Sequence, residues 1–363
     1  AAHCKTVHGP VQRVLWELKE SGMYEQKLLE TLSEYKALRI DEQIDYNKFY
    51  LYSLITHSTA IEGSTVTEIE NRLLFDEGIS AKGRSMAEQL MNLDLKAAYD
   101  ECIKVAPQHP QIDIDFLKHL SSIVMHSTGS KYNTVLGEFD SSKGDLRLVN
   151  VTAGVGGGSY LAFQKVPSRL QDFCDWLNRE RSQIDKSDIA ALYRLSFCAH
   201  YYLVTIHPWV DGNGRMSRLV MNFLQKEFGL VPSKILAADK SEYIMALQKS
   251  REKDDVGIIC DFLFNEHATN LRKEIDEFKQ AMASDVVIKP KNVAINVVIN
   301  DMERLVLDML RGDSSLSAAS LAEKLEMSAR QIQRILASLK EKQIIERIGS
   351  NKTGSWLVKW KVN

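Results

Sequence analysis

The most constraining feature of this sequence is an unusually apolar stretch at residues 188–206. Its apolar side chains recur at helical spacing and cover most sides of the predicted helix: Ile189, Ala190, Leu192, Tyr193, Leu195, Phe197 and Cys198. A helix that is apolar on most sides is normally buried in the middle of a domain. The stretch runs directly into residues 207–218. We therefore expect those residues to be mounted on a rigid central element.

The remainder of the first 280 or so residues reads as mainly helical. Leucines and valines recur at helical spacing in residues 11–32, and residues 112–128 form another predicted helix. This pattern breaks at two predicted short strands, residues 146–151 and 160–163, around a glycine-rich turn. The turn lacks the third glycine of a dinucleotide fingerprint and any Gly-Lys-Ser/Thr, so we interpret it as a hairpin rather than a nucleotide loop.

Residues 207–218 read His-Pro-Trp-Val-Asp-Gly-Asn-Gly-Arg-Met-Ser-Arg. After Gly214, apolar residues recur at i, i+3, i+4, i+7 and i+8 as far as Phe228, and Gly229 is well placed to end the helix. The residues before Gly214 therefore form a loop that enters a helix. A helix N-terminus offers unpaired N–H groups and a partial positive charge, which together favour an anion.

The side chains of this segment suit phosphate chemistry. Gly212 and Gly214 let the backbone approach an anion, and Arg215 and the arginine three residues later share one helix face. Asp211 is a hard-oxygen ligand suited to Mg²⁺, and His207, with an ordinary pKa near ~6.5, can accept a proton at neutral pH. Each feature alone has a structural explanation. His207 could be a histidine with its hydrogen bonds satisfied in the fold, the two arginines a solvated helix face, and Asp-Gly-Asn-Gly a turn. Their conjunction in one order favours a functional site.

The segment resembles the signature of the Fic family, His-Pro-Phe-x-Asp/Glu-Gly-Asn-Gly-Arg-x-x-Arg, with Trp209 in the usual Phe position. The resemblance covers about residues 50–270 and implies a mainly α fold, a Fic-type helical bundle with a β-hairpin flap. It implies a protein adenylyltransferase that moves AMP from Mg-ATP to a Ser, Thr or Tyr hydroxyl of a target protein. His207 would be the base and Asp211 the ligand of Mg²⁺. The implied phosphate-binding residues are Gly212, Asn213, Gly214, Arg215 and Arg218.

An upstream segment, Ser58-Thr59-Ala60-Ile61-Glu62-Gly63, resembles the inhibitory Fic pattern Ser/Thr-x-x-x-Glu-Gly/Asn. Gly63 is placed to end one helix, and Thr65–Glu68 is predicted to open the next as a capping box. Glu62 would then lie at a helix C-terminus, where a carboxylate is disfavoured by roughly 0.3–1 kcal/mol. The resemblance implies that Glu62 holds Arg218 and displaces the γ-phosphate of ATP. In some Fic proteins the same glutamate supports removal of AMP, so de-AMPylation as the chief activity stays open.

Two further positions follow from the resemblance. The predicted hairpin at residues 146–163 lies where Fic proteins carry a flap that docks the target, and an exposed strand can align a peptide by backbone pairing. Tyr243 is a candidate contact for adenine, although a core position is equally compatible with its sequence context.

The C-terminal residues are predicted to form a separate module. Helices near residues 301–310, 318–325 and 329–342 are followed by strands at 345–348 and 355–360, a succession that resembles a winged helix-turn-helix. From Ser328 to the end there are eight lysines and arginines against two glutamates. The candidate DNA contacts are Arg330, Gln331, Arg334, Arg347 and Lys352. A DNA-binding transcriptional regulator with a Fic sensor domain is therefore an alternative function, and protein interaction is an equal alternative for the module.

We thus expect an N-terminal helical region with the inhibitory motif (1–110), a Fic catalytic core (111–282), a linker (283–297) and a winged helix-turn-helix (298–363). The net charge of −2 predicts no partner by itself. Five cysteines without C-x-x-C spacing indicate a reduced compartment. We see neither a signal-peptide pattern nor an apolar run near the ~18 residues that span a bilayer. We expect a cytoplasmic protein without membrane contact, and a homodimer is a further expectation.

Overall fold

The computed structural model describes residues 22–153, 158–285, 301–325, 327–341, 344–348 and 355–358. It divides the chain into two compact units, Ala1–Phe278 and Lys279–Asn363. The predicted N-terminal region and catalytic core fall in one unit, because a single hydrophobic cluster runs from Leu28 to Ile275. Most of the predicted linker, the helical spacing near residues 11–18 and Lys352 lie outside the described residues.

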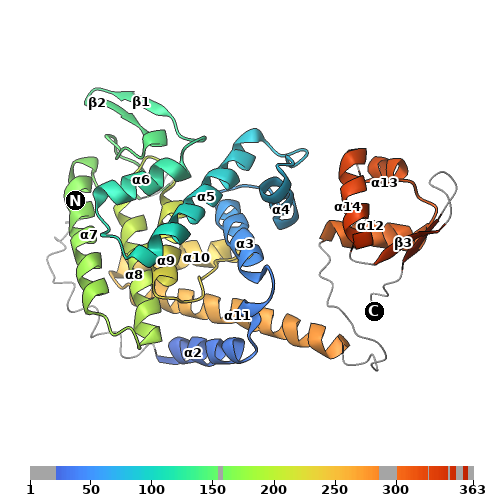
Figure 1. Ribbon diagram of the computed structural model, residues 1–363. Helices are drawn as coiled ribbons and strands as arrows, with labels where there is room; N and C mark the ends of the chain where they lie inside the picture. The colour runs from blue at the N-terminus through green and yellow to red at the C-terminus, as the bar shows by residue number, and fades with distance from the viewer. Residues whose placement is uncertain are drawn as a thin grey trace. The chain divides into compact units, whose positions relative to one another are not determined.

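The first unit is helical, as its periodicity predicts (Figure 1). Its α-helices are α2 (Gly22–Ala37), α3 (Tyr46–Ile61), α4 (Glu68–Glu77), α5 (Met86–Val105), α6 (Ile114–Val124), α7 (Val166–Gln183), α8 (Ile189–Ile206), α9 (Asn213–Glu227), α10 (Lys240–Lys253) and α11 (Gly257–Asp285). Short 3₁₀ turns connect several of them: η3 (Ile40–Glu42), η4 (Ala106–Gln108), η5 (Ser141–Lys143), η6 (Phe163–Lys165) and η7 (Ala237–Asp239).

Helix α8 is the core helix that the apolar stretch predicts. It packs against α7 and α9, and Leu192, Phe197 and Leu203 on different sides of it are buried. By length and composition alone α8 could cross a membrane, contrary to the expectation that no apolar run is long enough. However, 61% of this helix is buried inside the structure. We attribute its apolar character to its place in the core of this unit.

Helix α4 begins two residues later than predicted. Thr67, not Thr65, is its N-cap, and Thr67 forms a capping box with Glu70. Thr65 is engaged elsewhere, because its backbone N–H and its hydroxyl both donate to Glu88 at distances of 2.7 and 2.6 Å. Glu88 lies in the first turn of α5. The chain after Gly63 is therefore tied to α5 before α4 begins.

The strands of the first unit do not lie where the sequence predicts them. β1 (Lys131–Thr134) and β2 (Gly137–Asp140) pair antiparallel as a hairpin that projects from the helices (Figure 1). The rings of Tyr132 and Phe139 stack across it with centroids 4.9 Å apart. Each strand is four residues long and lacks the alternating apolar pattern by which a strand is predicted from sequence.

The predicted strands at residues 146–151 and 160–163 are wrong. This segment, which we call the flap segment (residues 146–153 and 158–163 of the described chain), contains a single antiparallel bridge between Thr152 and Ser159. Its carbonyl groups at Val149 and Leu161 accept hydrogen bonds from a side chain, Arg147, instead of from cross-strand amides. Within the described residues the two limbs are joined by this one bridge and do not form a ladder.

The second unit contains the predicted elements in the predicted order. They are α12 (Asp301–Gly312), α13 (Ala318–Lys324), α14 (Ala329–Glu341) and the antiparallel strands β3 (Ile345–Ile348) and β4 (Ser355–Val358). This unit has its own buried cluster, which includes Val306, Leu321, Ile332 and Leu339.

Candidate active site

The predicted motif forms the connection between α8 and α9. His207 ends α8 in the left-handed region, with φ 53° and ψ 60°. Gly212, also left-handed with φ 79°, precedes the first residue of α9. The side chain of Asn213 braces the loop by accepting from the N–H of Trp209 and donating to its carbonyl. The Trp209 indole, which is fully buried, donates to the carbonyl of Gly144 at 3.1 Å, so tryptophan is accommodated at this position.

The glycines of the motif are required by close packing. A Cβ on Gly212 would lie 2.7 Å from the Sδ of Met125, in addition to the strain of its positive φ. A Cβ on Gly214 would collide with Oε1 of Glu62 and lie 3.1 Å from Nη1 of Arg218. The N-terminus of α9 therefore faces the Glu62 carboxylate directly. This agrees with the expectation that the start of this helix favours an anion.

Arg215 is buried with few good acceptors. It is 2% exposed, and its Nη1 and Nη2 donate only weakly, to the carbonyl of Val124 at 3.4 Å and to the Sδ of Met125 at 3.1 Å. Its Nε has no hydrogen-bond partner in the described structure. Buried charges are normally paired and hydrogen-bonded. The Arg215 guanidinium therefore retains donors for an anion at the start of α9.

Arg218 lies on the same face and is held by the upstream motif. Its Nε donates to the Ser58 hydroxyl at 2.8 Å, and its Nη2 donates to the Ser58 carbonyl at 2.9 Å and to Oε1 of Glu62 at 2.5 Å. Glu62 is the C-cap of α3, and Gly63 follows with φ 104°. Burial alone raises the pKa of Glu62, but Arg218 outweighs it and lowers this pKa below its ordinary value. The predicted Glu62–Arg218 pair is thus present.

The imidazole of His207 is held in one orientation. Burial, opposed by the Val204 carbonyl, lowers the pKa of His207 to about 4. Its Nδ1 lies 3.3 Å from the carbonyl of Val204, which leaves Nε2 as the atom that can accept a proton. The ring of Tyr160 stacks on the imidazole with centroids 3.7 Å apart and planes inclined by 15°. At neutral pH the ring is therefore uncharged and competent as a base.

Asp211 is the candidate metal ligand. Its side chain is 67% exposed, its Oδ1 accepts from the N–H of Gly212 and its Oδ2 lies 3.8 Å from Nη2 of Arg215. The described residues contain no group of three or more His, Cys, Asp or Glu side chains that could hold a metal by themselves. A single exposed carboxylate beside an anion site still fits Mg²⁺, which usually combines one or two carboxylates with substrate phosphates and water.

Tyr243 is not placed to contact a nucleotide base. It is 1% exposed, and its hydroxyl lies 2.8 Å from Nε2 of His200 in the core. Burial alone lowers the pKa of Arg218, but Glu62 and then Tyr243 raise it above its ordinary value. The core alternative is therefore the one the structure shows, with Tyr243 behind Arg218.

The candidate DNA contacts lie in the second unit and differ in their surroundings. Arg330 and Arg334 are exposed on α14. Gln331 is occupied as a cap, because its Oε1 accepts from the N–H and the hydroxyl of Ser328. The Arg347 guanidinium lies 4.7 Å from the centre of the Trp356 ring. Among the candidates that the structure describes, Arg330 and Arg334 are therefore the exposed arginines whose N–H groups suit a phosphate contact.

Three residues around His207 carry no signal in the sequence. Arg147 donates from its Nε to the carbonyl of His207 at 2.7 Å, Tyr160 stacks on the imidazole, and the Arg251 guanidinium lies 5.1 Å from the centre of the Tyr160 ring. No motif marks them. Their partners are carbonyl groups and rings that only the folded chain brings together.

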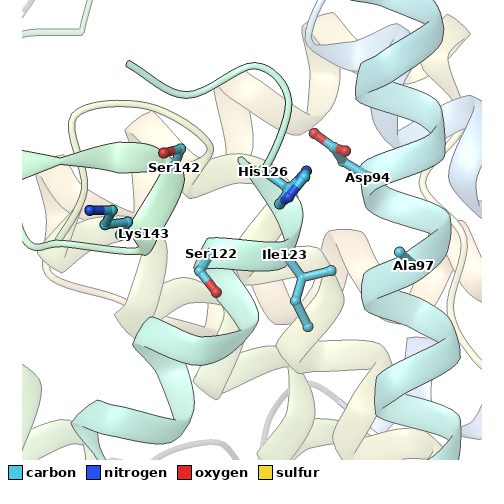
Figure 2. A pocket seen from close by; sticks show the side chains of 7 residues that line it. All are labelled: Asp94, Ala97, Ser122, Ile123, His126, Ser142 and Lys143. Atoms are coloured by element: carbon cyan, nitrogen blue, oxygen red, sulfur yellow. The ribbon is translucent and has the colours of Figure 1, made fainter. Parts of the chain in front are cut away.

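A cavity of about 560 Å³ lies outside this site. Figure 2 shows it between Asp94 and Ala97 of α5, Ser122 and Ile123 of α6, His126, and Ser142 and Lys143 of η5. No residue of the motif lines it.

Residues 111–225 match the model of the Fic/DOC family. This segment is similar to Fic/DOC domains. The solved structure of a Fic domain containing signaling protein from Bacteroides thetaiotaomicron has the same fold. The match has a TM-score of 0.58 and 19% identity, and it covers 70% of this chain and 98% of that one. The matched segment contains His207, Asp211 and both motif arginines, whereas Glu62 lies upstream of it.

Among curated proteins, the chain is 30% identical over 203 residues to protein adenylyltransferase fic-1 of Caenorhabditis elegans, a match that covers 55% of this chain and 36% of that protein. It is 33% identical over 204 residues to protein adenylyltransferase Fic of Drosophila willistoni, covering 55% and 37%. The chain therefore spans less than half the length of these Fic relatives.

Proposed function

We propose that this protein is a protein adenylyltransferase that transfers AMP from ATP to a hydroxyl group of a target protein. The observation that carries the proposal is that one short connection joins a neutral, oriented His207 at the end of α8 to the start of α9, where Arg215 is buried with an unpartnered Nε. An anion-binding cradle next to a base is what phosphate transfer to a hydroxyl requires. The curated relatives are named for this activity.

In the proposed reaction, Nε2 of His207 accepts the proton of the attacking hydroxyl, whose oxygen forms a bond to the α-phosphorus of ATP while pyrophosphate leaves. Arg215 and the N–H groups at the start of α9 bind the phosphate oxygens. Asp211 would hold Mg²⁺, which neutralises charge on the phosphates when it is bound. The chain's contribution is thus mainly orientation and electrostatics.

We further propose that the protein rests in an inhibited state. The Glu62 carboxylate lies against Gly214 and on Arg218, where it supplies the negative charge that the terminal phosphate of ATP would otherwise supply. Glu62 and the γ-phosphate would therefore compete for one guanidinium. De-AMPylation is the alternative in which the same carboxylate orients water.

The proposed activity is tested by incubating the protein and a cell lysate with ATP labelled at either the α- or the γ-phosphate. AMP transfer moves the α-label to protein and leaves the γ-label in solution, whereas phosphorylation does the reverse. The signal should require Mg²⁺ and disappear with His207→Ala, and Asp211→Asn should raise the Mg²⁺ concentration needed. Labelling that survives His207→Ala would rule out the proposed base.

A second function is favoured by the exposed arginines of α14. Arg330 and Arg334 lie one turn apart on the face opposite Ile332 and Leu336, which are buried. We propose that the second unit is a winged helix-turn-helix that binds duplex DNA through this face. Binding should weaken steeply with salt and should be reduced by Arg330→Ala with Arg334→Ala. Failure to bind any duplex at low salt would point to a protein partner instead.

A further inference from the structure

Arg147 is a buried cation at the junction of the flap segment and the motif loop. The residue is 1% exposed. Its Nε donates to the carbonyl of His207 at 2.7 Å, its Nη1 to that of Val149 at 2.8 Å and its Nη2 to that of Leu161 at 2.5 Å. Its own backbone N–H donates to the carbonyl of Pro208 at 3.1 Å. One residue thus joins both limbs of the flap segment to the residue that carries the base.

The partners of Arg147 are unusual for a buried charge. Within the described residues its guanidinium forms no ion pair with a carboxylate, and its acceptors are all backbone carbonyls. Because burial disfavours the charged guanidinium, the pKa of Arg147 lies below its ordinary value. A methionine could fill similar space without this desolvation cost. What methionine could not do is bridge three carbonyls with a planar fork of donors.

The carbonyl that Arg147 binds belongs to a residue with an uncommon backbone. His207 has φ 53°, a left-handed conformation that non-glycine side chains seldom adopt and that the surroundings must hold in place. The hydrogen bond from Nε of Arg147 fixes the direction of this carbonyl. The flap segment adds Tyr160, whose ring stacks on the imidazole. Backbone and side chain of His207 are therefore both held from the flap segment.

We propose that Arg147 is a positioning residue that locks the flap segment and the base His207 into one unit, so that a target docked on the flap meets a correctly oriented imidazole. This inference rests on the proposed adenylyltransferase function for its consequence, but not for its geometry. Arg147 acts through the backbone of His207 and the flap and does not itself contact the reacting atoms.

The charge of Arg147 gives a second signature. The charged and aromatic groups around His207 are Arg147, Arg251, Asp211 and Tyr160. After burial, the two arginines lower the pKa of His207, and Asp211 raises it. Loss of the Arg147 charge should therefore move the pKa of His207 from about 4 back toward its ordinary value. A residue that merely filled space would leave this pKa unchanged when replaced by an isosteric apolar side chain.

The test uses Arg147→Met and Arg147→Lys in the 363-residue Glu62→Gly chain, with Arg169→Met as a matched control. Arg169 is a partly exposed arginine of α7 that lies 3.4 Å from Asp172. The pKa of His207 is measured by NMR, with its signal assigned by comparison with His207→Ala. Amide exchange is measured at Tyr160, whose N–H donates to the Val151 carbonyl. The kinetic constants kcat and KM are measured for AMP transfer.

For Arg147→Met we expect a raised His207 pKa, faster exchange at Tyr160 and a kcat lower by about tenfold to a hundredfold, the scale of a misplaced catalytic group. Arg147→Lys retains the charge but not the fork, so exchange and kcat should still change, while the His207 pKa should rise less than in Arg147→Met. The control should match the Glu62→Gly parent. Arginine variants whose Tyr160 exchange and His207 pKa both equal the parent's would overturn the inference.

The two proposals fail differently. If the Glu62→Gly parent shows no AMP transfer, the proposed function is wrong, yet the NMR and exchange measurements still decide the role of Arg147. Suppose instead that the parent transfers AMP, and that Arg147→Met has the same kcat and the same amide exchange at Tyr160. The proposed function then stands, and the positioning role of Arg147 is wrong.

Discussion

At the scale of single residues, the site is organised by which charges have partners. Arg218 is held by hydrogen bonds to Ser58 and Glu62, whereas Arg215 has only weak acceptors and keeps an unpartnered Nε. The two arginines are three positions apart on one helix face, yet only Arg218 is held at hydrogen-bond distance by a carboxylate of the chain. We infer that Arg215 is open to substrate phosphate in the resting protein, while access to Arg218 depends on Glu62.

The lowered pKa of His207 makes a prediction for pH dependence. Because protonation is disfavoured down to about pH 4, AMP transfer by the Glu62→Gly variant should not lose its base between pH 7 and pH 5. The same shift means that the unfolded chain binds the proton more readily, so the free energy of unfolding should fall as pH drops from about 6.5 toward 4. An acidic limb of kcat centred near 6.5 would show that the imidazole is more exposed than in this structure.

Gly214 makes a second prediction at this scale, about stability. A methyl group there would have to displace Oε1 of Glu62, which Arg218 holds at 2.5 Å, so Gly214→Ala should destabilise the wild-type protein by about 1–3 kcal/mol, the usual cost of overpacking. In the Glu62→Gly background the collision is removed and the cost should be clearly smaller. Denaturant unfolding of the four proteins of this cycle measures the coupling. Equal costs in both backgrounds would mean that Glu62 does not press on Gly214.

At the scale of elements, the site is the meeting of two helix ends: the C-terminus of α3, with Glu62, and the N-terminus of α9. The start of α9 favours a negative charge, and in this structure Glu62 at the end of α3 provides it. Under the proposed inhibition, an ATP molecule that binds productively must displace the end of α3 from Arg218 or compete with it.

This competition can be measured without turnover. In the His207→Ala background, Mg-ATP should raise the melting temperature more when Glu62 is glycine than when it is present, since ligand that binds only the folded state stabilises it by an amount set by its affinity. A conservative comparison is Glu62→Gln, which keeps the side-chain length and removes the charge. If ATP shifts the melting temperature of all three proteins equally, the α3–α9 contact does not control nucleotide binding.

The helices of the site could be predicted from sequence and the flap could not. The period of apolar residues gave α8 and α9 nearly to the residue, and Gly63 marked the end of α3. The flap segment was predicted as paired strands because its apolar residues flank a glycine-rich turn. Its shape depends instead on Arg147, which bonds to a carbonyl 60 residues away. Local pattern carries no information about such a contact.

At the scale of the whole molecule, the chain is two units with separate cores. The motif, Glu62 and Arg147 all lie in the first unit, and the exposed arginines of α14 lie in the second. The catalytic and the DNA-binding proposals are therefore separable. The cytoplasmic location and a homodimer rest on the sequence alone and stay predictions.

A chain that ends at Asp285, the last residue of α11, tests this separation. It retains the cluster from Leu28 to Ile275, so we expect it to fold and to transfer AMP at a rate close to that of the 363-residue chain, while duplex DNA binding is lost. The 363-residue chain carrying the two α14 arginine substitutions is the matched control for DNA binding. Loss of AMP transfer on truncation, with the fold intact by circular dichroism, would show that the second unit contributes to catalysis.

The central claim is that the anion site at the start of α9 transfers AMP and that Glu62 holds it closed. The most direct test is the initial rate at which α-labelled ATP labels protein, measured side by side for the wild type, Glu62→Gly and Glu62→Gly with His207→Ala. We expect a low rate for the wild type, a rate higher by at least tenfold for Glu62→Gly, and none for the double variant. Equal rates for the wild type and Glu62→Gly would contradict the account.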